Sequence, residues 1–240
     1  MTLRDLLDRA QLRVQQVLGD AATSPLEKSV AIAESALHFG GLDGALGVDL
    51  NHVLELTTAP RPFRGLRDLV VRTTTPEDVA QVLSVGELTP DFLAKRYERG
   101  DRCWIGESQG AVLAMVWLHR GPSPFCEDAE RLACFSVGND TLWSYHAVAV
   151  PEARQSGVFV KVFQTALVDA LQQPGITRVR CRIKYSNVAS LKLHEALGFR
   201  RLGVLQSART PLGRVLRWRG AEPWTRIVST GDAIEVGFRA

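Results

Sequence analysis

The chain begins with two runs of apolar residues at helical spacing. Over residues 3–18, Leu, Ala and Val recur every three or four positions, and Gly19 ends the run. The second run begins at Ser24, a capping residue followed by Pro25 at the first helical position and then by Glu27. Both runs predict amphipathic helices, whose apolar stripes need a partner surface.

A connector comes after these helices. Residues 40–66 are rich in Gly and Pro and hold one short apolar patch at residues 53–56. We interpret them as a linking segment with one further helical turn. Residues 1–62 are therefore expected to form a helical N-terminal extension. It would serve as a lid, a dimer contact or an acceptor-recognition element, or simply pack on the rest of the protein.

From residue 63 onward the pattern changes to short apolar strands that alternate with helices. The expected strands cover residues 68–73, 102–108, 110–119, 141–150, 176–183, 199–205 and 213–218. Helices are expected to start at Thr75 and Thr89, each followed by Pro, and to cover residues 157–172 and 187–197. Residues 121–139 are expected to form a polar loop, and the tail at 221–240 holds two short strand-like pieces. This order predicts an α/β fold in which residues 63–220 form one domain with helices flanking a mixed sheet.

Composition narrows the function classes. The 240 residues carry a net charge of +3, which is mild for a nucleic-acid binder. No apolar run approaches the roughly 18 residues of a membrane span, and acidic residues among the first positions argue against a signal peptide. The four cysteines form no C-x-x-C pair, so neither a metal site nor a disulfide framework is expected. We predict a cytoplasmic protein with no nucleic-acid, membrane or metal partner.

One strand–turn–helix segment suits a phosphate ligand. An apolar strand ends at Val150, and the residues from Pro151 to Gly157 form a tight turn that leads into a helix. The first turn of a helix has unpaired backbone N–H groups and a partial positive charge, both of which favour an anion.

A second motif lies further along and makes the pattern specific. Asn187 and Ser190 open a helix that runs through His194 to Leu197–Phe199. In order and spacing, the two motifs resemble the acetyl-CoA-binding region of the GNAT (Gcn5-related N-acetyltransferase) family. The resemblance covers roughly residues 68–219.

The resemblance implies a fold, a cofactor and an activity. The fold would be a GNAT-like α/β domain with a mixed, mostly antiparallel central sheet, and a homodimer is left open. The activity would be N-acyltransfer, in which a primary amine of a small molecule or peptide directly attacks the thioester of acetyl-CoA or another acyl-CoA. The strand would bind the pantetheine arm, the turn would bind the pyrophosphate, and the Asn-x-x-Ser helix would line the cofactor. The residues so assigned are Val148, Ala149, Val150, Arg154, Gln155, Ser156, Gly157, Val158, Phe159, Asn187 and Ser190.

Three positions depart from the family pattern. Gln155 and Phe159 stand where the family usually has small residues that let the main chain approach the phosphates. Bulk at these positions would weaken cofactor binding, unless Phe159 points away from the phosphates. His194 stands where many members carry the Tyr that is thought to protonate the departing thiolate.

The expected reaction needs a base for the ammonium group of the acceptor. The family often places a Glu on this strand, and its lack here points to His146 or to a water relay. His146 is the candidate side chain, because the ordinary pKa of His lies near neutrality. The alternative is a hydrogen-bonded sheet residue. With strict alternation, His146 and Val148 share one face of the strand, and Tyr145 lies on the other. Tyr145 would line the acceptor pocket or pack against a helix. His194 would act as the acid or lie on the helix surface.

Cations occupy alternate positions in and just after the strand at 176–183. They are Arg178, Arg180, Arg182 and Lys184. Central strands of α/β folds are usually apolar on both faces. This face is therefore either a poorly covered edge with solvated cations or an anion site that faces the acceptor groove or a partner.

Two other functions are compatible with the sequence. One is a non-catalytic GNAT-like module that binds CoA without turnover. The other is an acyltransferase whose donor is the phosphopantetheine of a carrier protein. Such a donor lacks the nucleotide end of CoA and would tolerate a poor pyrophosphate turn.

Overall fold

The computed structural model describes residue 29 and residues 47–63, 65–86, 88–121, 124–126, 133–210, 213–220, 224–230 and 233–238. The helices expected at 3–18 and after Ser24 fall outside these residues, apart from the helical Ser29. The chain divides into two compact units, which we describe separately. The first unit comprises residues 1–54 and 182–224, and the second comprises residues 55–181 and 225–240.

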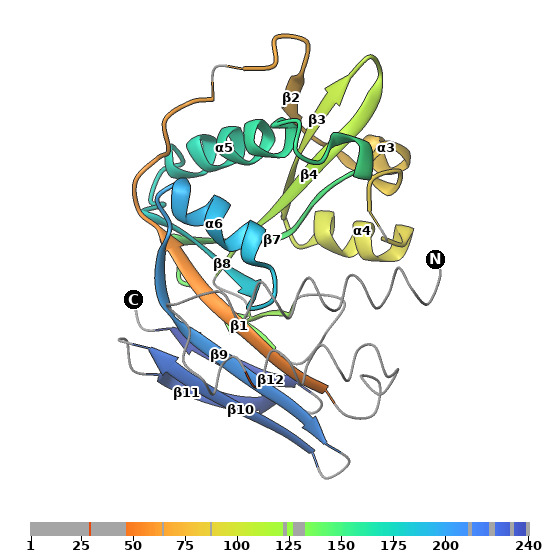
Figure 1. The fold of residues 1–240 in the computed structure, drawn as a ribbon. Helices are drawn as coiled ribbons and strands as arrows, with labels where there is room; N and C mark the ends of the chain where they lie inside the picture. Colours follow the sequence, from red (N-terminus) through yellow and green to blue (C-terminus); the bar gives the residue numbers. More distant parts are fainter. Residues whose placement is uncertain are drawn as a thin grey trace, which may run out of the picture. The chain divides into compact units, whose positions relative to one another are not determined.

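The second unit is built around a sheet of mostly antiparallel strands (Figure 1). Strands β2 (Val70–Thr73), β3 (Arg102–Ser108), β4 (Ala111–Arg120) and β7 (Thr141–Ala149) pair antiparallel in this order. The start of β8 (Arg178–Lys184) pairs with β7 in parallel. The expected turn at Gln109–Gly110 is confirmed, since both residues are left-handed, as a tight hairpin requires.

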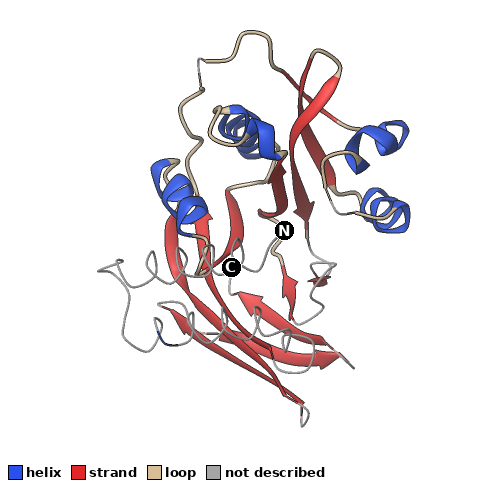
Figure 2. Ribbon diagram, turned by 45° about the vertical axis from the view of Figure 1, so that its right-hand side comes forward, coloured by secondary structure: helices blue, strands red, loops and turns tan. Residues whose placement is uncertain are grey.

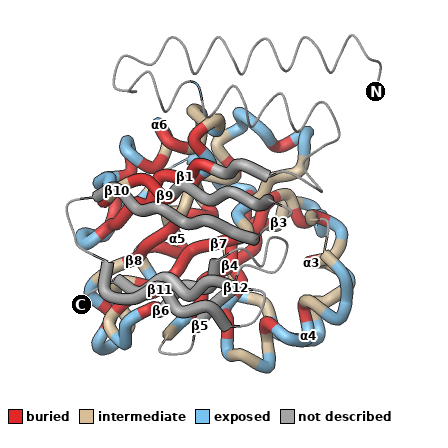
Figure 3. The backbone as a smooth tube through the Cα atoms, turned by 90° about the horizontal axis from the view of Figure 1, so that it is seen from below, coloured by how far each residue is buried: buried red, intermediate tan, exposed pale blue. Residues whose placement is uncertain are grey.

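Helices cover both sides of these strands. A short 3-10 turn, η1 (Pro76–Asp78), leads into α3 (Val79–Leu83) and then α4 (Pro90–Glu98). The capping role of Thr89 is confirmed, because its side chain accepts a hydrogen bond from the Phe92 N–H. Helix α5 (Val158–Leu171) packs on β3 and β4, and Figure 2 shows α3 and α4 on the opposite side. Strands β4 and β7 are consequently buried over most of their length (Figure 3).

A smaller sheet corrects one prediction. Strands β5 (Pro124–Cys126) and β6 (Ala133–Ser136) lie within the segment that was expected to be a polar loop. They join β12 (Ala233–Phe238) and β11 (Trp224–Thr230) in the order β11-β12-β6-β5. The loop prediction was wrong at these positions because the four-residue and three-residue strands are too short to show a periodic pattern. The two strand-like pieces of the tail are confirmed.

The first unit contains α6 (Val188–Ala196), β9 (Arg200–Thr210) and β10 (Gly213–Gly220), with β9 and β10 antiparallel. It also contains most of β1 (Gly47–Leu56), where a helical turn was expected. That expectation was wrong, because the buried polar residues Asn51 and His52 hide the alternation of a strand. Across the described residues of both units, the predicted α/β class is confirmed, and no helix is long and apolar enough to cross a membrane. The domain boundaries at residues 62 and 220 stay predictions.

Candidate functional site

Strand β7 changes its surroundings halfway along. Its first residues pair with β4 on one side and with β8 on the other, and the pairing with β8 ends at Ser144 opposite Cys181. Residues 141–145 are all buried, whereas residues 146–150 are partly or fully exposed. Among the described residues of the second unit, no strand pairs with this edge of β7 beyond Ser144. Within the second unit, the second half of β7 is therefore paired with β4 alone.

A β-bulge marks the change. Tyr145 lies opposite Trp117 and Val148 lies opposite Met115, so His146 and Ala147 together face Val116. His146 adopts a left-handed conformation with φ of 44°, which costs a residue with a side chain about 1–2 kcal/mol. The bulge corrects the predicted faces, because the extra residue brings Tyr145 and Val148 to the same face of the sheet.

The His146 ring packs beneath the loop that joins α3 to α4. A side-chain carbon placed on Gly86 would lie 3.0 Å from His146 Nε2 and 2.5 Å from the Met115 methyl group. The ring and the methyl group thus fill the space that only glycine leaves open at position 86. His146 is partly exposed as a residue, but its Nε2 atom is buried, so the base role falls to Nδ1.

Tyr145 has no access to a substrate. It is 5% exposed, its hydroxyl donates a hydrogen bond to the Asp101 carboxylate, and the Arg96 guanidinium lies 4.8 Å from its ring centre. Burial, followed by the negative charge of Asp101, raises the pKa of Tyr145 well above its usual range. Of the two roles considered for Tyr145, the structure favours packing against a helix over lining the acceptor pocket, and it argues against a proton-transfer role.

The main chain of the predicted cofactor strand faces two directions. The Val150 N–H donates to the Leu113 carbonyl of β4 at 2.9 Å, so it is already engaged. Successive residues of a strand alternate in the direction of their N–H and C=O groups. Val148 should therefore face β4 as well, whereas the N–H and C=O of Ala149 should face away from β4.

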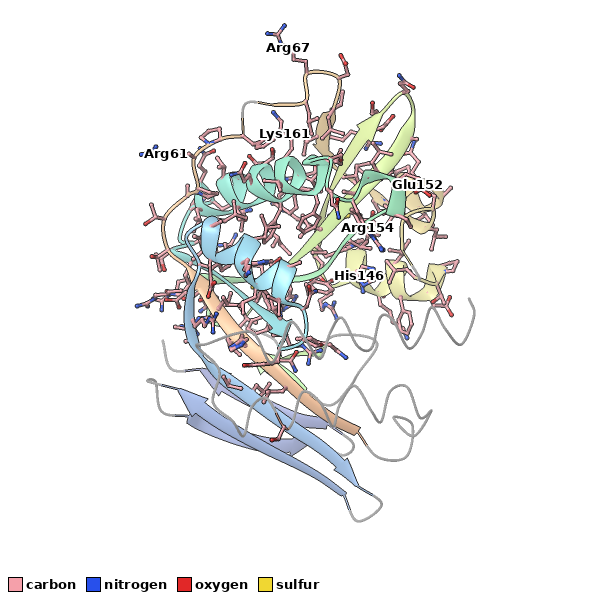
Figure 4. The ribbon with its side chains drawn as sticks, viewed as in Figure 1. Arg61, Arg67, His146, Glu152, Arg154 and Lys161 are labelled. Carbon is pink, nitrogen blue, oxygen red and sulfur yellow. The ribbon has the colours of Figure 1, made fainter. Side chains whose placement is uncertain are left out.

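The turn after β7 has the geometry of an anion-binding loop. A 3-10 turn, η2 (Pro151–Ala153), is followed by left-handed residues Gln155 (φ 65°) and Gly157 (φ 83°). The Ser156 hydroxyl accepts from the Val158 N–H at 3.3 Å and donates to the Ala153 carbonyl at 2.6 Å. Alternating conformations of this kind turn successive N–H groups toward one point. Figure 4 shows Arg154 at this turn, where it is exposed together with Gln155 and Ser156.

Two phenylalanines border this turn. The Phe159 ring stacks on Phe163, one helical turn further along α5, with centroids 5.6 Å apart, so Phe159 follows the helix and does not close the turn. Phe63 was not singled out by any sequence pattern. Its ring lies 3.3 Å from where a side chain on Gly157 would begin, and its carbonyl accepts from Lys161 Nζ at 3.1 Å. The segment before β2 thus forms one wall of the turn.

The remaining predicted residues lie in the first unit. The Asn187 side chain accepts from the Ser190 N–H at 3.2 Å and caps α6. His194 is 4% exposed and donates through Nδ1 to the Ser190 carbonyl at 2.7 Å. Burial lowers the pKa of His194 to about 4, so its ring is neutral at neutral pH and has no proton to spare for a thiolate. This corrects the expected surface position and weighs against the acid role. These residues and the β7 turn belong to different units, so their roles at one cofactor stay predictions.

Comparison with known proteins decides the family. Residues 67–199 match the model of the acetyltransferase (GNAT) family, which is more than half of the chain. The protein belongs to the GNAT acetyltransferase family.

Solved GNAT structures give a looser similarity. One neighbour is a putative GNAT-family acetyltransferase from Novosphingobium aromaticivorans, with 15% identity, 72% of this chain covered and a TM-score of 0.48. Another is a GCN5-related N-acetyltransferase from Kribbella flavida, with 9% identity, 75% covered and a TM-score of 0.49. A third is AAC(6')-Iy in complex with a bisubstrate analogue, with 16% identity, 55% of this chain and 90% of that chain covered, and a TM-score of 0.43. The GNAT chain spans 66% and 63% of the first two neighbours. No curated protein matches its sequence.

The row of cations on β8 has a structural explanation in this GNAT protein. Arg180 is 4% exposed and binds the fully buried Glu55 carboxylate through Nε at 2.8 Å and Nη2 at 2.7 Å. Arg178 contacts Glu55 at 3.7 Å and Asp140 at 3.0 Å. The expectation of solvated cations is therefore wrong for Arg180, and the anion beside it is the protein's own. Sequence analysis missed Glu55 because β1 was interpreted as a connector.

Proposed function

We propose that this GNAT protein transfers an acyl group, most simply acetyl, from acyl-CoA to a primary amine of a small molecule or peptide. The single observation that carries the proposal is the shape of β7 and the turn after it, a bulge at His146 followed by a turn with two left-handed residues. We infer that an extended pantetheine arm adds to β7 beyond the bulge as a further strand does. The pyrophosphate would then reach the N–H groups at the start of α5.

The residues of the second unit suggest how the reaction proceeds. Acyl-CoA supplies the reactive thioester. His146 accepts a proton from the ammonium group of the acceptor, and the resulting neutral amine attacks the thioester carbon. A main-chain N–H of β7 that faces away from β4, for which Ala149 is the candidate, polarises the carbonyl. The C–S bond breaks, and the second proton of the attacking nitrogen neutralises the thiolate. This route needs no proton from His194. Asn187 and Ser190 stay predicted cofactor residues.

A second donor is kept as an alternative because of Phe63. Its ring rests against Gly157, where the nucleotide end of CoA would pass. A phosphopantetheine on a carrier protein lacks that end. Carrier-protein acyltransfer is therefore the alternative function, and a CoA-binding module without turnover is an outcome of the test.

Binding of acetyl-CoA is tested by thermal shift with acetyl-CoA, longer acyl-CoAs, free CoA and acetyl-pantetheine. A ligand that binds only the native state raises the melting temperature. Stabilisation by acetyl-CoA, together with thiol release in the presence of an amine panel, supports the proposal. Stabilisation only by acetyl-pantetheine supports the carrier donor, and stabilisation without thiol release supports the non-catalytic module. No shift with any ligand contradicts the assignment of the turn.

Two glycines that flank α5 give a matched pair of variants. Gly157 and Gly175 are both left-handed, with φ of 83° and 78°, so alanine at either position should cost about 1–2 kcal/mol of stability. Only Gly157 lies at the proposed phosphate turn, and nothing lies within 4 Å of a side chain at Gly175. We expect Gly157→Ala to weaken acetyl-CoA binding at least tenfold and Gly175→Ala to leave it unchanged. Equal affinities in the two variants would refute the turn as the phosphate site.

A further inference from the structure

A buried carboxylate lies on the α4 side of the second unit, and its position is fixed by the main chain. Helix α4 ends with Gly100 in the left-handed conformation, φ 83°. The Gly100 N–H donates to the Tyr97 carbonyl at 2.9 Å, and the Asp101 N–H donates to the Arg96 carbonyl at 3.0 Å. These two bonds form a Schellman motif, the commonest way in which glycine ends a helix. The motif directs Asp101 from the end of α4 into the start of β3.

The Asp101 side chain collects hydrogen bonds from three other residues. It is fully buried, and it accepts from Arg99 at 2.6 and 3.0 Å, from His119 Nδ1 at 2.7 Å and from the Tyr145 hydroxyl. Burial alone would raise the pKa of Asp101, but the hydrogen bonds from His119, Arg99 and Tyr145 outweigh it and hold the pKa below its usual range. Asp101 is therefore a charged, fully bonded anchor at neutral pH.

Asp101 is connected to the bulge through a single residue, Tyr145. Tyr145 is the last β7 residue before the left-handed His146, and its ring is held between the Asp101 carboxylate and the Arg96 guanidinium. A non-glycine residue in this conformation persists only where its surroundings over-determine it. On the far side of the bulge, Val150 is fixed to Leu113. On the near side, the Tyr145 hydroxyl provides the fixed point.

We propose that Asp101 and Tyr145 are positioning residues, which hold β7 in its bulged register and so place the His146 ring beneath the loop that joins α3 to α4. The inference rests on the proposed function, in which His146 is the base. It gives Asp101 a role that the reaction itself does not require, because Asp101 touches no substrate.

The structure offers a matched control for the Tyr145 hydroxyl. Tyr97 also packs near Trp117, with ring centroids 5.3 Å apart, against 6.4 Å for Tyr145. Its hydroxyl hydrogen-bonds at 2.8 Å to Oγ1 of Thr74, which comes directly after β2. The variants Tyr145→Phe and Tyr97→Phe each remove one hydrogen-bonded hydroxyl from the same side of the sheet. Only Tyr145→Phe removes a hydrogen bond that holds the bulge in place.

The experiment compares the two variants with the wild-type protein. We expect Tyr145→Phe to lower kcat about tenfold with an unchanged KM for acetyl-CoA, and Tyr97→Phe to stay within twofold in both. We also expect the imidazole NMR signals of His146, assigned with His146→Gln, to shift in Tyr145→Phe and to match wild type in Tyr97→Phe. Unmoved signals in Tyr145→Phe, or equal kinetic effects in both variants, would overturn the proposal.

Two further outcomes are separable. If the wild-type protein releases no thiol with any amine, the proposed function fails, and the NMR comparison alone decides the anchor. If Tyr145→Phe does not fold, Asp101→Asn takes its place. It keeps the shape of the side chain and an oxygen for the Tyr145 hydroxyl, so we expect a smaller shift of the same His146 signals. An Asp101→Asn protein with wild-type His146 signals would overturn the proposal.

Discussion

The two halves of β7 show how one strand can serve stability and chemistry in turn. Residues 141–145 pair on both sides and are buried. Residues 146–150 are at least partly exposed and, within the second unit, pair only with β4. The bulge at His146 separates the two halves. Arg180 of β8, which pairs with Trp143 of the first half, is neutralised within the protein by Glu55. The second half is where we propose that the ligand binds. Substitutions in the two halves should therefore have different consequences.

The largest loss of stability is expected for a substitution beside the first half of β7, where Arg180 of β8 lies opposite Trp143. Arg180→Leu leaves the fully buried Glu55 without its closest cation, and breaking such a pair costs about 3–5 kcal/mol. Arg178→Leu is the control. Its side chain is 26% exposed and lies 3.7 Å from Glu55, so it should cost about 1 kcal/mol or less. Urea unfolding measures both, and equal losses would show that the Glu55 pair with Arg180 has no special role.

The second effect is the pH dependence of the unfolding free energy, to which His194 contributes. The pKa of His194 is about 4 in the folded protein and about 6.5 in an unfolded chain. Its folded pKa is depressed, so folding favours the neutral ring. That stabilisation is complete above pH 6.5 and is lost as the pH falls toward 4. The loss is on the order of 3 kcal/mol. Unfolding free energies between pH 7 and pH 4 should fall less steeply in His194→Asn than in wild type.

A smaller effect tests the boundary between the halves. His146→Gly and His146→Ala both remove the proposed base, and we expect each to lower kcat/KM about a hundredfold. Because φ at position 146 is 44°, the glycine variant should be about 1 kcal/mol more stable than the alanine variant. Thermal unfolding measures the difference. Equal stabilities would mean that the bulge relaxes when the ring is removed.

The smallest effect is expected beyond the second half. Gln155 and Gln109 are both exposed and left-handed, with φ of 65° and 52°. Glycine should stabilise the protein by up to about 1 kcal/mol at either position. Only Gln155→Gly should also lower the KM for acetyl-CoA, by a few fold, because it restores a small residue to the turn. A lowered KM in Gln109→Gly would point to a general effect of stability.

Sequence patterns anticipated much of this fold, and the failures have physical causes. The helices with Thr-Pro starts, the β3–β4 hairpin and the strand–turn–helix after β7 were found because local propensity and capping agree there. Strand β1 was missed because its polar residues Asn51, His52 and Glu55 are buried, and each has a partner in the folded chain. The bulge was missed because its left-handed position is held by histidine, whereas a glycine there would have indicated a bulge.

The anchor at Asp101 could not be found in this way. Its partners His119 and Tyr145 are 18 and 44 positions away, and their side-chain types are common in sheets. The strand–turn–helix around residues 150–157 was placed correctly as an element of the fold, and its role as the cofactor site stays a prediction. The direction of each main-chain group and the wall formed by Phe63 depend on tertiary packing, which no local pattern contains.

The Schellman motif at Gly100 also limits how this protein can diverge. Asp101 is aimed by the last turn of α4, and each residue added to or removed from a helix rotates the exit of the chain by about 100° around the helix axis. Exposed positions of α4 can therefore change freely, whereas a single insertion or deletion between Thr89 and Gly100 would swing the carboxylate away from Tyr145. In related chains that keep the Asp–Tyr pair, the length of this helix should vary far less than its surface composition.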